Sequence, residues 1–225
     1  EILNHFDLRQ PYTKEMGEFL ARKYDSNVMR AIIKAARGGA LFSGDQGGTG
    51  LENATFNTDA SVLIDGLSAA KQALDEKDVP VDSMPVHGLL QPAQWYLVAR
   101  SDKNLNRDTN GGAASIRSMT LETIDEISIH KSNIAPFGED STVGNFIDDT
   151  NDDFIPAYYR GQYGTTVGLV WTPMAAASAI VQDVSFQTED QIRKQGALML
   201  ARLMVGTRTL RNKCAVELRT GAVPV

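Results

Sequence analysis

Residues 7 to 36 read DLRQPYTKEMGEFLARKYDSNVMRAIIKAA and predict one continuous helix. Asp7 is a suitable N-cap, Pro11 fits the first turn, and the pair Gly38 and Gly39 follows the last apolar residues. About 30 residues rising 1.5 Å each give a rod of roughly 45 Å, whereas the mean globular helix has about 11 to 12 residues. Other parts of the chain must therefore lie along this helix.

The apolar residues of this helix form a row that winds around its axis. Four residues turn the chain by about 400°, so each i, i+4 step moves the row by about 40°. The two ends of the helix are therefore expected to pack on different partners. The row consists of Tyr12, Met16, Leu20, Tyr24, Val28 and Ile32, with Phe19, Met29 and Ile33 beside it. Glu18 and Arg22 form an i, i+4 pair of favourable orientation, as expected for an exposed face.

The composition restricts the class of protein. With 225 residues, 42% of them hydrophobic, the chain can bury a full core as one or two domains. A net charge of -6 argues against a protein that grips nucleic acid through a basic surface, but allows one that lines a DNA-filled cavity. The single cysteine, Cys214, excludes an intrachain disulfide and a multi-cysteine metal site. No apolar run approaches the roughly 18 residues needed to span a bilayer, so no membrane partner is predicted.

The first half of the chain predicts an α/β layer behind the long helix. Gly44 to Gly50 is expected to be a connecting loop, because it lacks the Gly-Lys-Ser/Thr ending of a phosphate-binding loop. The elements expected after it are a helix capped by Asp59 and running to about Lys77, a buried strand from Val86 to Leu90, a helix from Pro92 to Arg100, a short helix from Ile116 to Ile124, and a strand containing Ile127 and Ile129.

The second half begins with a polar segment, residues 138 to 165, that carries interleaved aromatic residues. A segment of this length is more often an ordered loop or contact surface than a linker. The elements expected after it are a strand from Val167 to Thr172, a helix-permissive stretch from Met174 to Ile180, a strand from Val184 to Gln187, a helix or continued strand from Gln195 to Val205, and a final strand from Cys214 to Leu218.

Candidate catalytic and metal-binding residues are few. His5, His87 and His130 are far apart in the sequence and show no metal-ligand spacing. Asp149, Asn151 and Asp153 imitate the opening of a calcium loop, but Phe154 and Arg160 replace its required glycine and glutamate. Cys214, in an alternating strand, is interpreted as a small buried hydrophobic residue. The prediction is no catalytic site, no cofactor and no metal.

Four motifs, in order along the chain, resemble major capsid proteins of short-tailed phages related to T-seven. The entry to the long helix carries Asn4, His5, Phe6, Asp7, Leu8 and Arg9, then Tyr12, Gly17 and Leu20. The middle of the chain carries Asp78, Val79 and Pro80 before Pro92 and Tyr96, and Ile127 to Ile129 before Lys131, Ser132, Asn133 and Pro136. The closing segment carries Phe186, Gln187, Gly206, Leu210, Arg211, Ala215 and Val216.

The chain departs from this family in several places. Met84 with Pro85, and Asp125 with Glu126, stand where family members usually carry an Arg and a Gly. The segments Ser101 to Ser118 and Gly138 to Tyr163 match no family motif. The sequence opens directly at the long helix, so the family's N-terminal arm and extended loop are expected to be missing from it.

The resemblance implies an α+β fold of the Hong Kong 97 capsid type. Residues 1–40 would form the spine helix of the peripheral domain, residues 41–181 the axial domain, and residues 182–225 the return to the peripheral domain with a final strand. The implied function is a non-enzymatic subunit of an icosahedral shell that encloses the double-stranded DNA of a tailed phage. The segment Gly138 to Tyr163 is expected to contact neighbouring subunits near the local symmetry axis.

The resemblance also implies the partners. The chain would bind itself in hexamers and pentamers, a scaffold protein and the portal during assembly, and packaged double-stranded DNA non-specifically; a decoration protein is allowed. It would be made in the cytoplasm of a bacterial host and reside in the virion capsid. Two alternatives stay open: an encapsulin-type compartment with the same fold, against which the phage-like start of the helix counts, and a soluble α/β enzyme or binding module with a site built from dispersed residues such as His87 and Asp82.

Overall fold

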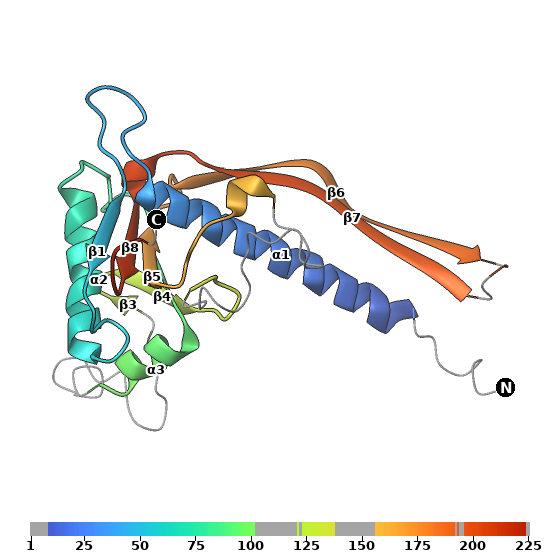
Figure 1. The fold of residues 1–225 in the computed structure, drawn as a ribbon, viewed down its shortest axis with the longest axis horizontal. Coiled ribbons are helices and arrows are strands. Elements are labelled where there is room, and N and C mark those ends of the chain that lie inside the picture. Colours follow the sequence, from blue (N-terminus) through green and yellow to red (C-terminus); the bar gives the residue numbers. More distant parts are fainter. Residues whose placement is uncertain are drawn as a thin grey trace.

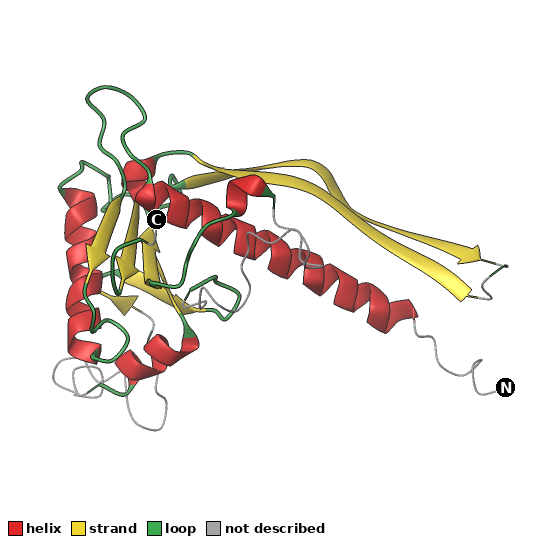
Figure 2. Cartoon of the chain, in the orientation of Figure 1, coloured by secondary structure: helices red, strands yellow, loops and turns green. Residues whose placement is uncertain are grey.

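The computed structural model describes residues 9–101, 121, 123–137, 156–191, 193 and 196–223. It contains a long helix, a long two-stranded hairpin beside that helix, and a six-stranded sheet with shorter helices at one end of the rod (Figures 1 and 2). Among the described residues, no helix is both long enough and apolar enough to cross a membrane.

Helix α1 (Arg9–Arg37) confirms the predicted long helix. Its 29 residues give a rod of about 44 Å at 1.5 Å per residue. Lys34 and Arg37 lie in the last turn, where cations favour the negative end of the helix dipole. The helix ends at Arg37, just before Gly38, and Gly48 packs so closely on the carbonyl groups of Ala35 and Ala36 that a Cβ there has no room. The predicted cap Asp7 lies outside the described residues.

The two ends of α1 pack on different partners, as predicted. The N-terminal half runs along the hairpin, whereas the C-terminal half meets the six-stranded sheet (Figure 1). Burial rises along the helix accordingly: the side chain of Tyr12 is 53% exposed, while that of Ile32 is 2% exposed. The expected ion pair between Arg22 and Glu18 is present at 3.9 Å on the exposed face.

The sheet has the strand order β1-β8-β5-β2-β4-β3. Its strands are β1 (Thr49–Glu52), β2 (His87–Leu90), β3 (Thr123–Ile124), β4 (Ile127–Lys131), β5 (Thr166–Trp171) and β8 (Ala215–Arg219). The β1/β8 and β2/β4 pairs are parallel, and the other three are antiparallel. The final strand β8 therefore lies inside the sheet, between the edge strand β1 and β5, whereas the other strands come from the first three quarters of the chain or so.

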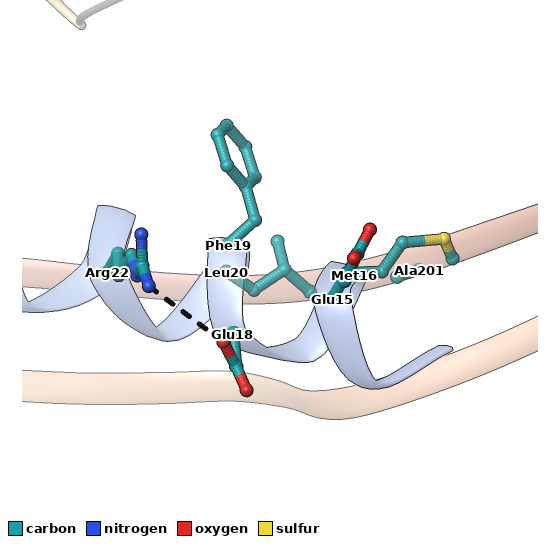
Figure 3. A pocket seen from close by; sticks show the side chains of 7 residues that line it. All are labelled: Glu15, Met16, Glu18, Phe19, Leu20, Arg22 and Ala201. Carbon is teal, nitrogen blue, oxygen red and sulfur yellow. Dashed lines mark ion pairs between the residues drawn. The ribbon is translucent and has the colours of Figure 1, made fainter. Parts of the chain in front are cut away.

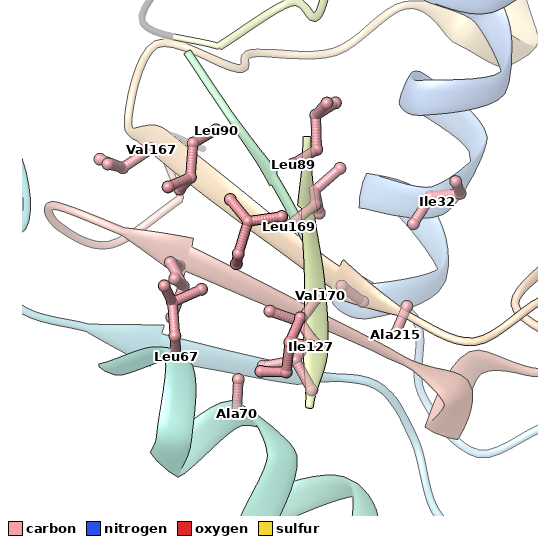
Figure 4. Packing of buried hydrophobic residues seen from close by; sticks show 14 of the residues in the cluster. Ile32, Leu67, Ala70, Leu89, Leu90, Ile127, Val167, Leu169, Val170 and Ala215 are labelled. Atoms are coloured by element: carbon pink, nitrogen blue, oxygen red, sulfur yellow. The ribbon is translucent and has the colours of Figure 1, made fainter. Parts of the chain in front are cut away.

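Two further helices complete the core. Helix α2 (Ala60–Asp75) begins at the predicted cap Asp59, whose side chain accepts hydrogen bonds from two backbone N–H groups, and α3 (Pro92–Ala99) begins with the predicted proline. Leu67 and Ala70 of α2 pack on apolar residues of the sheet, and Ile32 of α1 approaches the sheet from another side (Figure 4). The sheet is thus enclosed by helices that the sequence predicts.

The long hairpin joins β6 (Ala176–Gln191) to β7 (Gly196–Thr209). The strand alternative for Gln195 to Val205 is confirmed, but the expectation of a helix-permissive stretch from Met174 to Ile180 is wrong. Small residues there pair with the far end of β7, for example Ala176 with Thr209. Cross-strand pairing over this length overrides the weak local preference of alanine and serine for helix.

Two other local expectations are corrected. Thr49 and Gly50, expected in a loop, pair with β8 as part of β1. The end of the helix expected at Ile116 to Ile124 is instead strand β3, and the rest of that segment lies outside the described residues. Asp125 and Glu126, which stand where the resembled family carries glycine, form the tight turn to β4 with φ values of 51° and 64°. The Lys71 ammonium pairs with the exposed carboxylate of Glu126 at 2.8 Å.

One buried ion pair fixes α1 on the sheet. Arg37 donates to both carboxylate oxygens of Glu217 on β8, at 2.8 and 2.7 Å, and Glu217 is 0% exposed. Thr166 donates to the same carboxylate at 2.5 Å, and Arg37 also donates to the carbonyl of Gln162 at 2.6 Å. The charges are thus paired and hydrogen-bonded, as charges removed from water must be.

Removing one partner of this pair will destabilise the unassembled subunit. Arg37→Met leaves an uncompensated carboxylate in the core, so the free energy of unfolding is expected to fall by about 3–5 kcal/mol. The double variant Arg37→Met with Glu217→Leu should recover much of this loss, because it removes both charges. Urea unfolding followed by tryptophan fluorescence measures both. A loss below about 1 kcal/mol in the single variant would contradict the assignment.

A second series tests the gradient of burial along α1. Ile32→Asp buries an unpaired charge in the core and is expected to lower the free energy of unfolding by several kcal/mol. Val28→Asp, at a partly buried position, should have a smaller effect, and Phe19→Asp, at an exposed one, a negligible effect in the unassembled subunit. Equal effects at Ile32 and Phe19, measured by the same urea titration, would show that the helix is placed wrongly.

Candidate functional site

The structure brings together two histidines that the sequence keeps apart. His87 on β2 and His130 on β4 lie on neighbouring parallel strands with their ring centroids 6.0 Å apart, and Trp171 lies 5.9 Å from His87. The register explains the proximity, because His130 lies opposite Leu89, two residues along from His87 and on the same face. Sequence spacing alone does not reveal this pair, since it depends on strand pairing.

This pair lacks the partners of a catalytic site. Burial lowers the pKa of His87, and the charge on His130 lowers it further. Within the part of the chain that the structure describes, neither imidazole has a hydrogen-bond partner, and no hydrogen bond or ion pair joins His87 to the exposed Asp82. General acid–base catalysis needs an oriented base near a substrate pocket. The pair therefore does not form the site that the enzyme alternative requires.

The other candidates are a buried cysteine and residues that the structure does not describe. Cys214 is 1% exposed, as predicted for a buried residue, and it closes a short 3-10 helix just before β8. No group of three or more potential metal ligands occurs among residues 9–101, 123–137, 156–191 and 196–223. Asp149, Asn151 and Asp153 lie outside the described residues, as does His5.

The aromatic end of the polar segment is built into the chain. Tyr159 and Tyr163 are buried, and the hydroxyl of Tyr159 exchanges hydrogen bonds of 3.0 and 2.8 Å with the backbone of Thr207 on β7. Tyr158 lies between two cations: Lys34 at 4.8 Å from its ring centroid and Arg208 at 3.9 Å. These tyrosines anchor the base of the hairpin to α1, so the buried rings of Tyr159 and Tyr163 are not exposed for the contact with neighbouring subunits that is expected of residues 138–163. Residues 138–155 of that segment lie outside the described residues.

The side chain of Lys34 is partly buried where α1 contacts Tyr158. Lys34 donates a hydrogen bond to the backbone carbonyl of Tyr158. Partial burial lowers the pKa of Lys34, and the nearby charge of Arg208 lowers it further, whereas Tyr158 acts in the opposite direction. Such a lysine holds two segments together. The lowered pKa follows from this packing of Lys34 against Tyr158.

A concave surface lies between the N-terminal half of α1 and strand β7 of the hairpin. A groove of about 710 Å³ is lined by Glu15, Met16, Glu18, Phe19, Leu20, Arg22 and Ala201 (Figure 3). Its floor is apolar, and its charged residues lie on α1, where Glu18 pairs with Arg22. A second groove lies beside Gly17, over which the ring of Phe186 packs. Neither groove holds a set of converging polar groups such as a small-molecule site uses.

The hairpin exposes apolar residues on the face turned away from α1. Along β7 the inner residues are partly covered, and the outer residues Leu198, Leu200 and Met204 are exposed. In the described part of the chain β6 and β7 pair only with each other, so each strand has one free edge. Long free edges and exposed apolar residues are features of surfaces that bind other protein chains. The arrangement therefore favours protein association over catalysis.

Comparison with known proteins points the same way. The model of one protein family, described as Gp10A-like major capsid protein, matches residues 1–219. The capsid structure of cyanophage P-SCSP1u superposes with a TM-score of 0.80 at 25% sequence identity, covering 98% of this chain and 68% of that one. The mature capsid of bacteriophage PhiM1 superposes with a TM-score of 0.76 at 14% identity, covering 97% of this chain and 67% of that one.

A more distant likeness extends beyond these phages. A virus-like particle from Pyrococcus furiosus superposes with a TM-score of 0.50 at 13% identity, covering 90% of this chain and 64% of that one. At that identity the likeness concerns the fold alone. No curated protein matches the sequence.

The histidine pair gives a testable pH dependence. Because the pKa of His87 is lowered in the folded state, the unfolded chain binds a proton first as the pH falls below about 6.5. Stability is therefore complete above that pH and declines from there down to the folded pKa. His130→Phe should raise the pKa of His87 in an NMR titration. An unchanged titration curve for His87 would contradict the electrostatic contact.

Proposed function

The chain belongs to the Gp10A-like family of major capsid proteins, and on this premise we propose that it forms an icosahedral shell around the double-stranded DNA of a short-tailed phage. It is a capsid shell subunit, and the predicted α+β fold of the Hong Kong 97 type is confirmed by its likeness to phage capsid structures. The subunits would assemble as hexamers and pentamers that tile the shell. Repeated heterologous contacts that close into rings provide such an arrangement.

The observation that carries the proposal is that the subunit has a complete core, from which the N-terminal half of α1 and the β6–β7 hairpin project with exposed apolar residues. The sheet, α2, α3 and the last turns of α1 bury a full set of apolar residues. The N-terminal half of α1 and the hairpin extend beyond this core and expose Tyr12, Phe19 and Met204. A monomer gains nothing from exposing them, whereas a subunit with several neighbours buries them in contacts.

We propose the following division of the chain. Residues 1–40 form the spine helix of the peripheral domain, residues 41–181 the axial domain, and residues 182–225 the return to the peripheral domain with a final strand. The hairpin beside α1 supports a peripheral unit built from both ends of the sequence. The pairing of β8 with β1 and β5 implies that the final strand serves the axial sheet.

The proposed partners follow from the same role. The subunit has no enzymatic activity, and it would contact a scaffold protein and the portal during assembly in the bacterial cytoplasm. It would meet packaged DNA without sequence preference, because a net charge of -6 disfavours tight phosphate binding and salt screens the remaining repulsion. A decoration protein could bind the outer surface.

Electron microscopy of the full-length protein tests the proposal. Expression with its scaffold protein is expected to give uniform hollow shells tens of nanometres across. Small discrete particles with and without the scaffold would contradict it and favour a soluble binding protein or enzyme. Shells that form without the scaffold protein and enclose a cellular enzyme, identified by mass spectrometry after purification, would instead favour an encapsulin-type compartment.

A further inference from the structure

The loop after α1 carries an exposed apolar pair. Residues 38–48 project beyond the end of the helix as a narrow loop, closed at its base by a 2.8 Å hydrogen bond from the Gly48 N–H to the Gly38 carbonyl (Figure 1). Leu41 is 52% exposed and Phe42 is 68% exposed. Neither belongs to the hydrophobic core of the subunit. A projecting loop with a free aromatic ring is a suitable anchor for another protein.

The loop holds this pair in a defined position. The Asp45 N–H donates to the Phe42 carbonyl at 3.1 Å, which closes a four-residue turn, and Gly44 has the φ of 89° that a type II turn needs at its third position. Lys213 pairs with Asp45 at 3.7 Å, and Asn212 donates to the Gly39 carbonyl at 2.7 Å. A preformed anchor loses little conformational entropy on binding.

The groove lined by Met16, Phe19, Leu20 and Ala201 has a size and character that suit such an anchor. Its volume of about 710 Å³ lies within the range of about 300–1,000 Å³ that is typical of binding clefts. The loop cannot reach the groove of its own chain. The distance along α1 from Leu20 to Arg37 is about 25 Å. Half of the loop of residues 38–48 spans at most about 17 Å, and the loop projects away from the groove. An occupant of this kind must come from another copy.

The charges around the two surfaces are complementary once the ion pairs within each surface are set aside. Glu15, Glu18 and Arg22 line the groove, and Glu18 pairs with Arg22, which leaves the negative charge of Glu15. At the base of the loop Lys213 pairs with Asp45, which leaves the positive charge of the exposed Arg211. Opposite charges around an apolar contact favour one orientation of docking and disfavour contact between like surfaces. Contacts between the loops of two subunits, or between their grooves, are therefore less favourable than a contact between a loop and a groove.

We propose that Leu41 and Phe42 of one subunit insert into the groove between α1 and β7 of a neighbouring subunit. This inference rests on the proposed shell function and names one of its interfaces. The two surfaces lie at opposite ends of α1 and differ from each other, so the contact is heterologous. A heterologous contact propagates from copy to copy and closes when the rotation between copies allows a ring.

Cross-linking of assembled shells tests the contact directly. Ser43→Cys beside the anchor and Glu15→Cys at the groove leave the apolar residues in place, and the natural Cys214 is buried and does not react. A bismaleimide reagent added to shells of the double variant is expected to give a ladder of dimers up to closed rings on a denaturing gel. Each single variant should give no ladder, because a heterologous contact never brings two copies of one position together.

A second variant tests the energetic role. Phe42→Ser should raise the subunit concentration at which shells appear by at least about tenfold, because one aromatic side chain per subunit is no longer buried. Phe42→Leu is the matched control and should assemble nearly normally. Both are expected to keep the melting temperature of the unassembled subunit, since the side chain is exposed there.

The outcomes separate this inference from the shell function. The wild-type protein could form shells while the double cysteine variant gives no ladder, or while Phe42→Ser assembles normally. Either result would refute the anchor and leave the shell function intact. That result would indicate that another segment covers the groove. Absence of shells from the wild-type protein would refute the proposed function itself.

Discussion

The ion pair between Arg37 and Glu217 is the contact on which the placement of the long helix depends. It joins positions 180 residues apart, and the carboxylate is fully removed from water. Two bonds from the guanidinium and one from Thr166 surround the carboxylate, so its position tolerates little displacement. Because a guanidinium must meet a carboxylate in one plane, the pair fixes the last turn of α1 in both rotation and height against the sheet. Apolar packing of Ile32 and Ile33 alone would specify this less sharply, since hydrophobic contact is non-directional.

This attachment at one end explains the shape of the molecule. A rigid helix fixed at its C-terminus projects its first half away from the sheet, and the hairpin follows it (Figure 2). Tyr158 and Tyr159 bind the base of the hairpin, while Phe186 packs over Gly17 farther out. The stability of the subunit thus resides at the enclosed end, and the projecting end offers surface to other molecules. Such a division lets interface residues vary without affecting the core.

The sequence predicts the local elements well and the long-range contacts poorly. Asp59 and Pro92 predict the starts of their helices, because N-capping and the fixed φ of proline act within a few residues. Strand β6 was missed at its start, since alanine and serine there have no strand preference and are held by pairing with β7. The turn at Asp125 and Glu126 shows the same limit: Asp tolerates positive φ but Glu does so rarely, and both residues adopt it where β3 pairs with β4.

The candidate surfaces show why a class of protein is easier to predict from a sequence than the residues of its contacts. Aromatic side chains in a polar stretch suggest an interface, but Tyr159 and Tyr163 serve the interior, and a sequence cannot say which rings find partners within the chain. Leu41 and Phe42 lie between the expected long helix, which ends at Ala36, and the expected loop, which begins at Gly44, and the sequence pattern assigns them no role. Their exposure depends on the turn closed by Gly44 and on the contact of Asn212 with Gly39, which is again a link between distant parts of the chain. An interface residue is recognised by the absence of an internal partner, and that absence can be established only when the fold around it is known.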